Sequence, residues 1–337
     1  MADIHNGSDR MTDLFRRLNG VGMNQSYVKS TALPEWWSAA VANSTSGYDQ
    51  TLLLLSRHLG LSLSSLRSSG VPEFRNTESW KYHRQVNATP QDVQVTSAIC
   101  FRIAQMVAAG VQTPVAIPSD AGFVRDEILG RGAPWVSYGN LVQFCWANGI
   151  PVVHVRTLPK RAGKIAGMVT VIDGRPVIIL SKSHKHSAWL LFVLAHELGH
   201  IICGHVANGD ALIEDHDLSE GVDDDNEQEK EATGCGLHII TGSKNRRIQG
   251  PKMPATALAR AASKYGSEFK VDPGHVALNY SNSLGTDFYG LGNAALNILE
   301  PKADAGRIAT EAMFQHFDWS CISDDSADFL TRAVGKG

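Results

Sequence analysis

The chain has 337 residues, of which 43% are hydrophobic and 19% are charged, and its formal net charge is −3. This composition excludes an intrinsically disordered chain and is typical of a globular protein with two or three domains. Residues 210–231 hold eleven acids and one base, Lys230, so the remainder is mildly basic. Such a remainder tolerates an anionic partner but does not by itself indicate a nucleic-acid-binding protein.

The cysteines and the N-terminus indicate where the protein works. The five cysteines are dispersed and form no C-x-x-C pair (Cys100, Cys145, Cys203, Cys235 and Cys321). This pattern argues for a reducing compartment, and against both a disulfide framework and a thiolate zinc site. Since the N-terminus lacks the features of a secretion signal and no apolar run is long enough to span a membrane, we expect a cytoplasmic protein without membrane contact.

Residues 1–115 are expected to form a helical N-terminal region. Residues 49–58 precede Gly60 in the pattern of a helix with a glycine C-cap, residues 61–66 begin another, and residues 90–110 keep a helical apolar stripe. Short helices with tight turns suggest a helix-turn-helix-like unit. Because residues 1–88 hold nine bases and seven acids, only weak DNA contact is expected there. Trp36 and Trp37 are interpreted as packing anchors in preference to a partner-docking surface.

Residues 116–245 have the pattern of an α+β domain. A helix over 136–148 leads into a buried strand over 151–155, and residues 168–172 and 175–180 flank Asp173-Gly174, a pair typical of a tight hairpin. Pro176 favours an edge position for the second arm, because proline cannot donate to a β-ladder. A substrate is therefore expected to add as a strand along residues 177–181. Further along the chain, after the segment 193–200, an acidic loop leads into a helix over 226–240.

Residues 193–200 read Val-Leu-Ala-His-Glu-Leu-Gly-His, and a wholly apolar run over 188–195 leads into the histidines. On a helix His196 and His200 lie on one face, because four residues make about one turn. Two imidazoles so placed can bind one Zn²⁺ ion, with Glu197 beside it to take a proton from water as the general base. His205, five residues beyond His200, lies off this face and is interpreted as a structural residue.

A catalytic zinc needs a third protein ligand, and the acidic segment offers several carboxylates. Glu229 is preferred, because it opens a helix able to pack against the zinc helix, where Gly234 and Gly236 would permit close approach. Glu220 stands twenty residues beyond His200 but has the surroundings of a solvated loop. Glu220, Glu227 and Glu231 stay open as alternatives.

Residues 246–337 are expected to form a helical C-terminal domain. Helices are predicted over 254–265, after the Asp272-Pro273 cap, and over 294–299 and 304–317. His238, His275 and Tyr280 are candidates for an oxyanion-stabilising side chain, and the sequence does not choose among them.

These motifs together resemble the ImmA/IrrE metallopeptidases over about residues 118–245. They are a Gly-Ile-Pro-Val strand entry, a hairpin arm ending Val-Ile-Ile-Leu, the Ala-His-Glu-Leu-Gly-His helix and Glu-x-Glu-Ala about thirty residues later. The resemblance implies a zincin-like core, a small mixed sheet with an edge hairpin, flanked by helical regions. The family's second motif continues with Asn, Phe, Ala and Pro, where this chain has Thr233, Cys235, Gly236 and Gly242. These differences leave the ligand Glu229 in place, but they replace the Asn side chain and with it the contact that this Asn makes beside the site.

The resemblance also implies a function. Members of this family are cytoplasmic zinc endopeptidases that cleave helix-turn-helix repressors and thereby derepress stress or mobile-element genes. A protein substrate, such as a repressor encoded nearby, is the expected partner. The alternatives are a regulatory DNA- or protein-binding module that keeps the zinc-site fold, or the toxin of a toxin–antitoxin pair.

Overall fold

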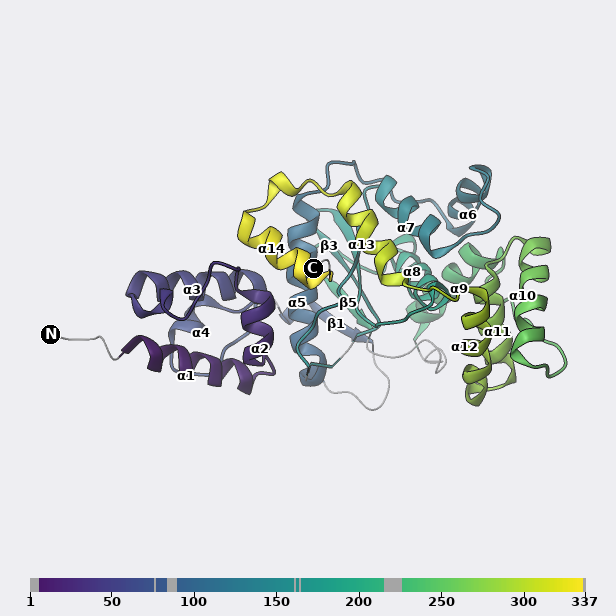
Figure 1. Ribbon diagram of the computed structural model, residues 1–337. Helices are drawn as coiled ribbons and strands as arrows, with labels where there is room; N and C mark the ends of the chain where they lie inside the picture. The colour runs from purple at the N-terminus through teal and green to yellow at the C-terminus, as the bar shows by residue number, and fades with distance from the viewer. Residues whose placement is uncertain are drawn as a thin grey trace.

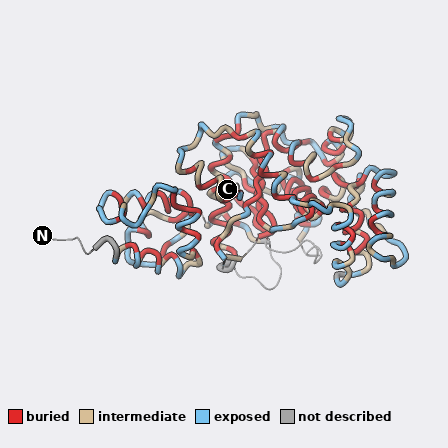
Figure 2. Tube along the Cα trace, viewed as in Figure 1, coloured by how far each residue is buried: buried red, intermediate tan, exposed pale blue. Residues whose placement is uncertain are grey.

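The computed structural model of the protein describes residues 6–75, 77–83, 90–160, 162–163, 165–214 and 226–335. Helices surround one five-stranded mixed sheet with the strand order β1-β5-β3-β4-β2 (Figure 1). This arrangement confirms the expected α+β class, with helical regions on both sides of a small mixed sheet. The buried residues run through the sheet and its covering helices and continue into the helical groups at either end (Figure 2).

The sheet consists of β1 (Trp80–His83), β2 (Val152–His154), β3 (Gly167–Ile172), β4 (Arg175–Leu180) and β5 (Ala211–Glu214). The predicted hairpin is confirmed, since β3 and β4 pair antiparallel. Asp173 and Gly174 both have positive φ angles, 49° and 79°. A two-residue turn with this geometry matches the right-handed twist of the strands that it joins.

The expected edge position of β4 is wrong. β4 lies between β3 and β2, and it pairs in parallel with β2 from Ile178 onward. The Ile178 N–H donates to the Pro151 carbonyl oxygen beside β2. Because backbone groups two residues apart on a strand point to the same side, the nitrogen of Pro176 also faces this side, but at a position before β2 begins. The proline is therefore tolerated without an edge strand, and residues 177–181 offer no free edge to a substrate.

Helices cover both faces of the central strands. α5 (Pro90–Ala109) and α8 (Ser187–Ile202) each pack against β3 and β4, and they lie on opposite sides of the sheet in Figure 1. Both faces are therefore closed, in agreement with the almost continuous burial of β4. α7 (Tyr138–Ala147) packs against α8 and β2, while α6 (Ala121–Gly130) packs against α9 (Glu227–Thr241).

The N-terminal helices α1 (Asn6–Gly20), α2 (Gln25–Tyr27), α3 (Thr45–Leu59) and α4 (Leu63–Arg67) form a group at one end of the molecule (Figure 1). The predicted glycine C-cap of α3 is confirmed, because Gly60 has a φ of 69°. Trp37 packs edge-on against Phe15 and donates to the Thr51 hydroxyl, which fits an anchoring role. Trp36 is 48% exposed, and its indole N–H donates to Asp325 near the C-terminus.

The C-terminal helices divide into two sets. α10 (Ala255–Phe269), α11 (Pro273–Leu284) and α12 (Tyr289–Leu299) pack on one another at the end of the molecule opposite α1. α13 (Ala305–His316) returns to α7 and β2, and α14 (Asp324–Ala333), which the sequence analysis did not predict, packs against α3. Among the described residues, no helix combines the length and apolar character needed to cross a membrane.

Three buried histidines give the fold a pH dependence. Burial lowers the pKa values of His58, His154 and His275 from 6.5 to about 4. Between pH 6.5 and about 4 these histidines bind protons in the unfolded chain but not in the folded chain. The stability of the fold is therefore full above pH 6.5 and is lost as the pH falls toward 4. At pH 5 each histidine costs about 2 kcal/mol of stability.

His154→Gln tests this account. A glutamine amide can replace the bond from the His154 Nε2 to the Lys182 carbonyl oxygen, 3.0 Å away, but it does not titrate. Urea unfolding at pH 7 and pH 5 should show a smaller loss of stability in the variant, by about 2 kcal/mol. An equal loss in both proteins would contradict a neutral, buried His154.

Candidate metal centre

α8 places the two histidines as the sequence predicts. His196 and His200 are both fully buried, and their Nε2 atoms lie 3.0 Å apart. The apolar residues of α8 pack on β3, β4 and α7 and so keep both histidines away from solvent. Two ring nitrogens that face each other inside a protein core need a shared partner, because their lone pairs and protons find no water there.

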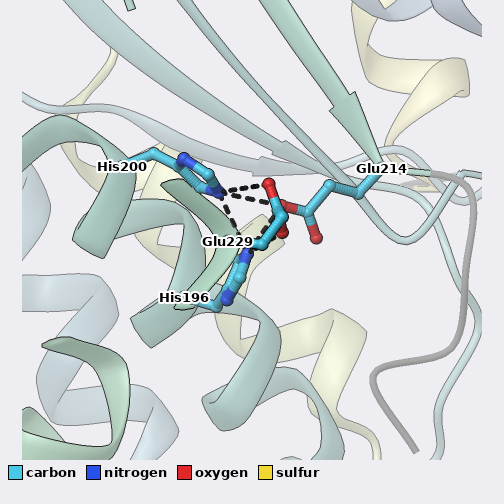
Figure 3. Close-up of side chains that lie close together, drawn as sticks. All are labelled: His196, His200, Glu214 and Glu229. Carbon is cyan, nitrogen blue, oxygen red and sulfur yellow. Dashed lines mark hydrogen bonds and ion pairs between the residues drawn. The ribbon is translucent and has the colours of Figure 1, made fainter. Parts of the chain in front are cut away.

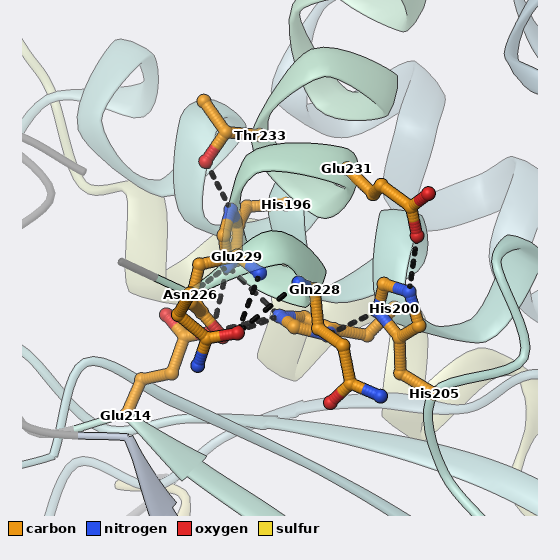
Figure 4. Close-up of polar contacts among 9 residues, drawn as sticks. All are labelled: His196, His200, His205, Glu214, Asn226, Gln228, Glu229, Glu231 and Thr233. Carbon is orange, nitrogen blue, oxygen red and sulfur yellow. Dashed lines mark hydrogen bonds and ion pairs between the residues drawn. The ribbon is translucent and has the colours of Figure 1, made fainter. Parts of the chain in front are cut away.

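α9 brings Glu229 to this pair. The Asn226 side chain caps the helix by accepting from the backbone N–H groups of Gln228 and Glu229, which fixes where the first turn begins (Figure 4). The Glu229 carboxylate is 3% exposed and lies 3.2 Å from the Nε2 of His196 and 3.3 Å from that of His200.

Glu229 reaches the two histidines because α8 and α9 pack closely against each other, and two glycines permit this close packing. A Cβ on Gly199 would lie 2.5 Å from the Ala232 carbonyl oxygen, and one on Gly236 would lie 3.0 Å from the backbone of Ala195 and His196. The predicted close approach is confirmed at Gly236. It is wrong at Gly234, where a Cβ would meet nothing nearer than Lys244, at 3.7 Å.

The two α9 glycines therefore give opposite expectations on replacement by alanine. Gly234→Ala should stabilise the protein by about 1 kcal/mol, because alanine is the better helix former and the space is open. Gly236→Ala should destabilise it by about 1–3 kcal/mol, because the new methyl group would force α8 and α9 apart. Denaturant unfolding measures both values, and equal effects of the two changes would contradict the observed helix contact.

Glu214, at the end of β5, is the residue that the sequence analysis missed. Its Oε1 lies 2.6 Å from the Nε2 of His196 and 3.1 Å from that of His200, and the side chain is 1% exposed. Figure 3 shows this carboxylate converging with Glu229 on the two imidazoles. The apolar Ala211, Leu212 and Ile213 were the available signal for a strand, but the density of acids around them favoured a solvated loop.

The far ring nitrogens of both histidines have partners of their own. The Nδ1 of His196 lies 3.1 Å from the Thr233 hydroxyl oxygen, and that of His200 lies 2.9 Å from the Nδ1 of His205, whose Nε2 lies 3.0 Å from Glu231 (Figure 4). Such contacts hold the ring orientation and direct Nε2 toward the cluster, where a metal would bind. Thr233 therefore supplies a hydrogen-bonding group where the ImmA/IrrE motif has Asn, and the structural role expected for His205 agrees with its place beside His200.

Glu197 lies in the same core, next to β3. Both its carboxylate oxygens are buried without a hydrogen-bond partner among the described residues. Gly167 faces it so closely that a Cβ there would lie 1.9 Å from Oε1, so only glycine leaves room for the carboxylate. Burial raises the pKa of Glu197 well above its usual value, and the negative charges of Glu214 and Glu229 raise it further. Such a carboxyl is poised to exchange a proton.

The charges of the cluster fit a metal cation. Burial opposes a charge on His196, but Glu214 and Glu229 outweigh it and raise the histidine's pKa well above 6.5. Burial likewise opposes ionisation of Glu214, but the two histidines lower its pKa to about 2. Three buried carboxyl groups thus face two imidazoles, and a divalent cation would supply the missing positive charge. Ligand atoms of His196, His200, Glu214 and Glu229 all lie within 4.8 Å of one another, as one metal ion requires.

The other candidates lie elsewhere. Glu227 and Glu231 are exposed on α9, and Glu220 falls outside the described residues. The Tyr280 hydroxyl donates to the Pro251 carbonyl, while His275 packs against Phe192 beside a cavity of about 330 Å³ between α8, α9 and α11. Neither belongs to the cluster. A second group of Cys203, His205 and Glu231 has ligand atoms within the same distance, but two of its three members are exposed.

Comparison with protein families gives one match, and it covers the segment that carries this cluster. Residues 151–239 match the model of the IrrE N-terminal-like domain, peptidase family M78. These residues form an IrrE N-terminal-like domain. The match confirms the resemblance drawn from the motifs, over a narrower segment than residues 118–245. Comparison with curated proteins gave no match to the chain, and comparison with solved structures gave none either.

The IrrE-like domain runs from β2 to α9 and so contains β3, β4, α8 and β5. All four clustered residues and Glu197 lie within it. Its family is one of metallopeptidases, and the buried histidine and glutamate side chains are compatible with a metal ion. The chain is therefore assigned a metallopeptidase-type domain, flanked by helical regions that the match does not cover.

Proposed function

We propose that the protein is a zinc-dependent endopeptidase, with His196, His200 and Glu229 as zinc ligands and Glu197 as the general base. One observation carries this proposal. Inside a domain of a peptidase family, two imidazole nitrogens and a glutamate converge in the core beside a second glutamate whose oxygens have no partner among the described residues. A purely structural metal site has no need of that second carboxyl group.

Zinc is the metal that these residues suit best. Imidazole nitrogens and one carboxylate are the ligand set of many catalytic zinc sites, whereas magnesium and calcium prefer sites made of oxygen atoms. The absence of a cysteine from the cluster argues against an iron–sulfur or blue-copper site.

Glu197, Thr233 and His205 have separate roles in the proposed reaction. Zinc, when bound, supplies Lewis acidity, which lowers the pKa of water and polarises the scissile carbonyl group. Glu197 accepts the proton of the attacking water and delivers it to the leaving amine, since a buried carboxyl with a raised pKa can serve in both directions. Thr233 and His205 hold the rings of His196 and His200 in the orientation that presents Nε2.

For the substrate we propose a cytoplasmic protein partner, such as a helix-turn-helix repressor encoded nearby. The family resemblance supports this choice. The test is co-expression in one cell of this chain and the product of the neighbouring regulatory gene, so that any cellular trigger is present. The wild-type chain should produce one discrete fragment of the partner, and the Glu197→Gln variant should produce none. The same fragment from both proteins, or an intact partner with both, would overturn the assignment.

The second candidate function is that of a regulatory binding module, and the position of Glu214 among the clustered side chains favours it. Structural zinc sites are closed by four protein ligands, whereas catalytic sites keep one position open. A fourth ligand in the cluster, Glu214, would therefore fit a site that serves folding alone. The role of Glu214 decides between a closed structural site and a peptidase held inactive.

A further inference from the structure

We propose that Glu214 is a fourth protein ligand of the metal, delivered by a strand that occupies the place of the substrate, so that the structure is that of a latent peptidase. This inference rests on the proposed function and deepens it. It concerns what closes the site, while the proposed function concerns what the site does once it is open.

Most distances around the cluster are close to those of a site with four ligands, and only the 2.6 Å contact between His196 and Glu214 is clearly shorter. In a tetrahedral zinc site, bonds of about 2.0–2.1 Å place neighbouring ligand atoms about 3.3 Å apart. The two Nε2 atoms are 3.0 Å apart, and Oε1 of Glu214 lies 2.6 and 3.1 Å from them. Glu229 lies 3.2 Å from the Nε2 of His196 through its Oε2 and 3.3 Å from that of His200 through its Oε1. With zinc bound, Glu214 would take the fourth position, which a catalytic site leaves for water.

Burial and charge favour ligation over a fortuitous contact. Glu214 is 1% exposed, and its Oε2 has no hydrogen-bond partner among the described residues. An ionised carboxylate that is buried with one oxygen unpaired is costly, even though its Oε1 contacts the two histidines. A divalent cation at the cluster removes most of that cost, since it interacts with both Glu214 and Glu229 directly.

The strand that carries Glu214 lies where an extended substrate would have to lie. β5 pairs antiparallel with β3, and Glu214 is opposite Gly167. Gly167 is the residue that faces the Glu197 carboxylate, so a chain paired with β3 at this point passes the general base and the metal ligands together. Peptide ligands commonly bind by adding a strand to a sheet edge. β5 fills that position on β3, and β1 covers its other side.

Removal of the Glu214 carboxylate should therefore open one coordination position without removing the metal. Cobalt(II) replaces zinc in such sites, and its visible spectrum reports the number and type of ligands. The probe is acetohydroxamate, a small chelating inhibitor that needs an open position. If the wild-type site is open about 1% of the time, its apparent affinity for the probe is about 100-fold weaker than that of Glu214→Ala.

The experiment titrates acetohydroxamate into the cobalt-loaded full-length proteins, wild type, Glu214→Ala and Glu214→Gln, and follows the visible spectrum. Glu214→Gln keeps the size of the side chain and so guards against misfolding of the alanine variant. Glu227→Gln, which removes an exposed acid from the same helix that carries Glu229, is the matched control and should behave as wild type. Hydrolysis of fluorescent casein is measured in parallel, and the Glu214 variants should exceed the wild type, because loss of the carboxylate also removes the metal bond that would hold β5 over the cluster.

The outcomes separate this inference from the proposed function. Equal probe affinities in wild type and both Glu214 variants would overturn the fourth ligand, while leaving a catalytic zinc intact. Tighter probe binding without any gain in casein hydrolysis would support the ligand but overturn the latency. Failure of the wild type to bind cobalt at all would overturn the proposed function together with this inference.

Discussion

Replacement of Glu197 by glutamine is expected to abolish peptide hydrolysis and to leave the metal content unchanged. Glu197 is not among the clustered ligand residues, so its loss removes no metal ligand. Its carboxyl group is the only titratable group assigned to proton transfer, and general acid–base catalysis contributes about 10²–10⁴-fold to a rate. Glutamine matches its shape in the tight space beside Gly167, so the fold should persist.

The measurement compares zinc content and turnover in matched pairs. Because a latent wild type would hide the effect in a purified system, the variant is also made in the Glu214→Ala background, where the position is expected to be open. Glu227→Gln, which removes an exposed acid from α9, serves as the control with unchanged turnover. A Glu197→Gln protein that turns over the substrate at the rate of its parent would disprove the assigned base.

Glu229→Gln is expected to have the second large effect, on metal binding itself. Loss of a residue that only supports a ligand already weakens metal binding about 10–100-fold, so loss of a ligand should exceed about 100-fold. Glu229 contacts both histidines from the first turn of α9, whereas Glu227 is exposed and Glu231 contacts only His205.

Competition with a zinc-binding dye measures this effect on the three glutamine variants of α9. Glu229→Gln should lose affinity, and Glu227→Gln should retain it. Glu231→Gln should show at most a modest loss, because Glu231 acts only through His205. If Glu229→Gln bound zinc as tightly as the wild type, the third ligand would have to be sought elsewhere, with Glu214 as the nearest carboxylate.

Much of this site could be predicted because its signals are local. The four-residue spacing of His196 and His200 places both on one helix face in any fold. The Asp173-Gly174 turn specifies its hairpin through two residues alone. Glu229 could be ranked above its neighbours because only a helix that packs on α8 needs a glycine at position 236.

The missed features depend on pairing between distant segments. β1 and β5 are four residues each and pair with one another across more than a hundred residues of chain, so no local periodicity marks them. Pro176 suggested an edge strand, but the short β2 begins only at Val152, opposite Ile178, and so leaves Pro176 unpaired on that side. Glu214 went unrecognised for the same reason. Its importance comes from the register of β5 on β3, which opposes it to Gly167.

The central claim is that one zinc ion lies among His196, His200, Glu214 and Glu229. X-ray absorption at the zinc edge of the zinc-loaded full-length protein tests it most directly. We expect one zinc per chain with nitrogen and oxygen ligands at about 2.0–2.1 Å, scattering from two imidazoles, and no sulfur. A sulfur ligand at about 2.3 Å would place the ion at Cys203 with His205 and Glu231, and would contradict the account.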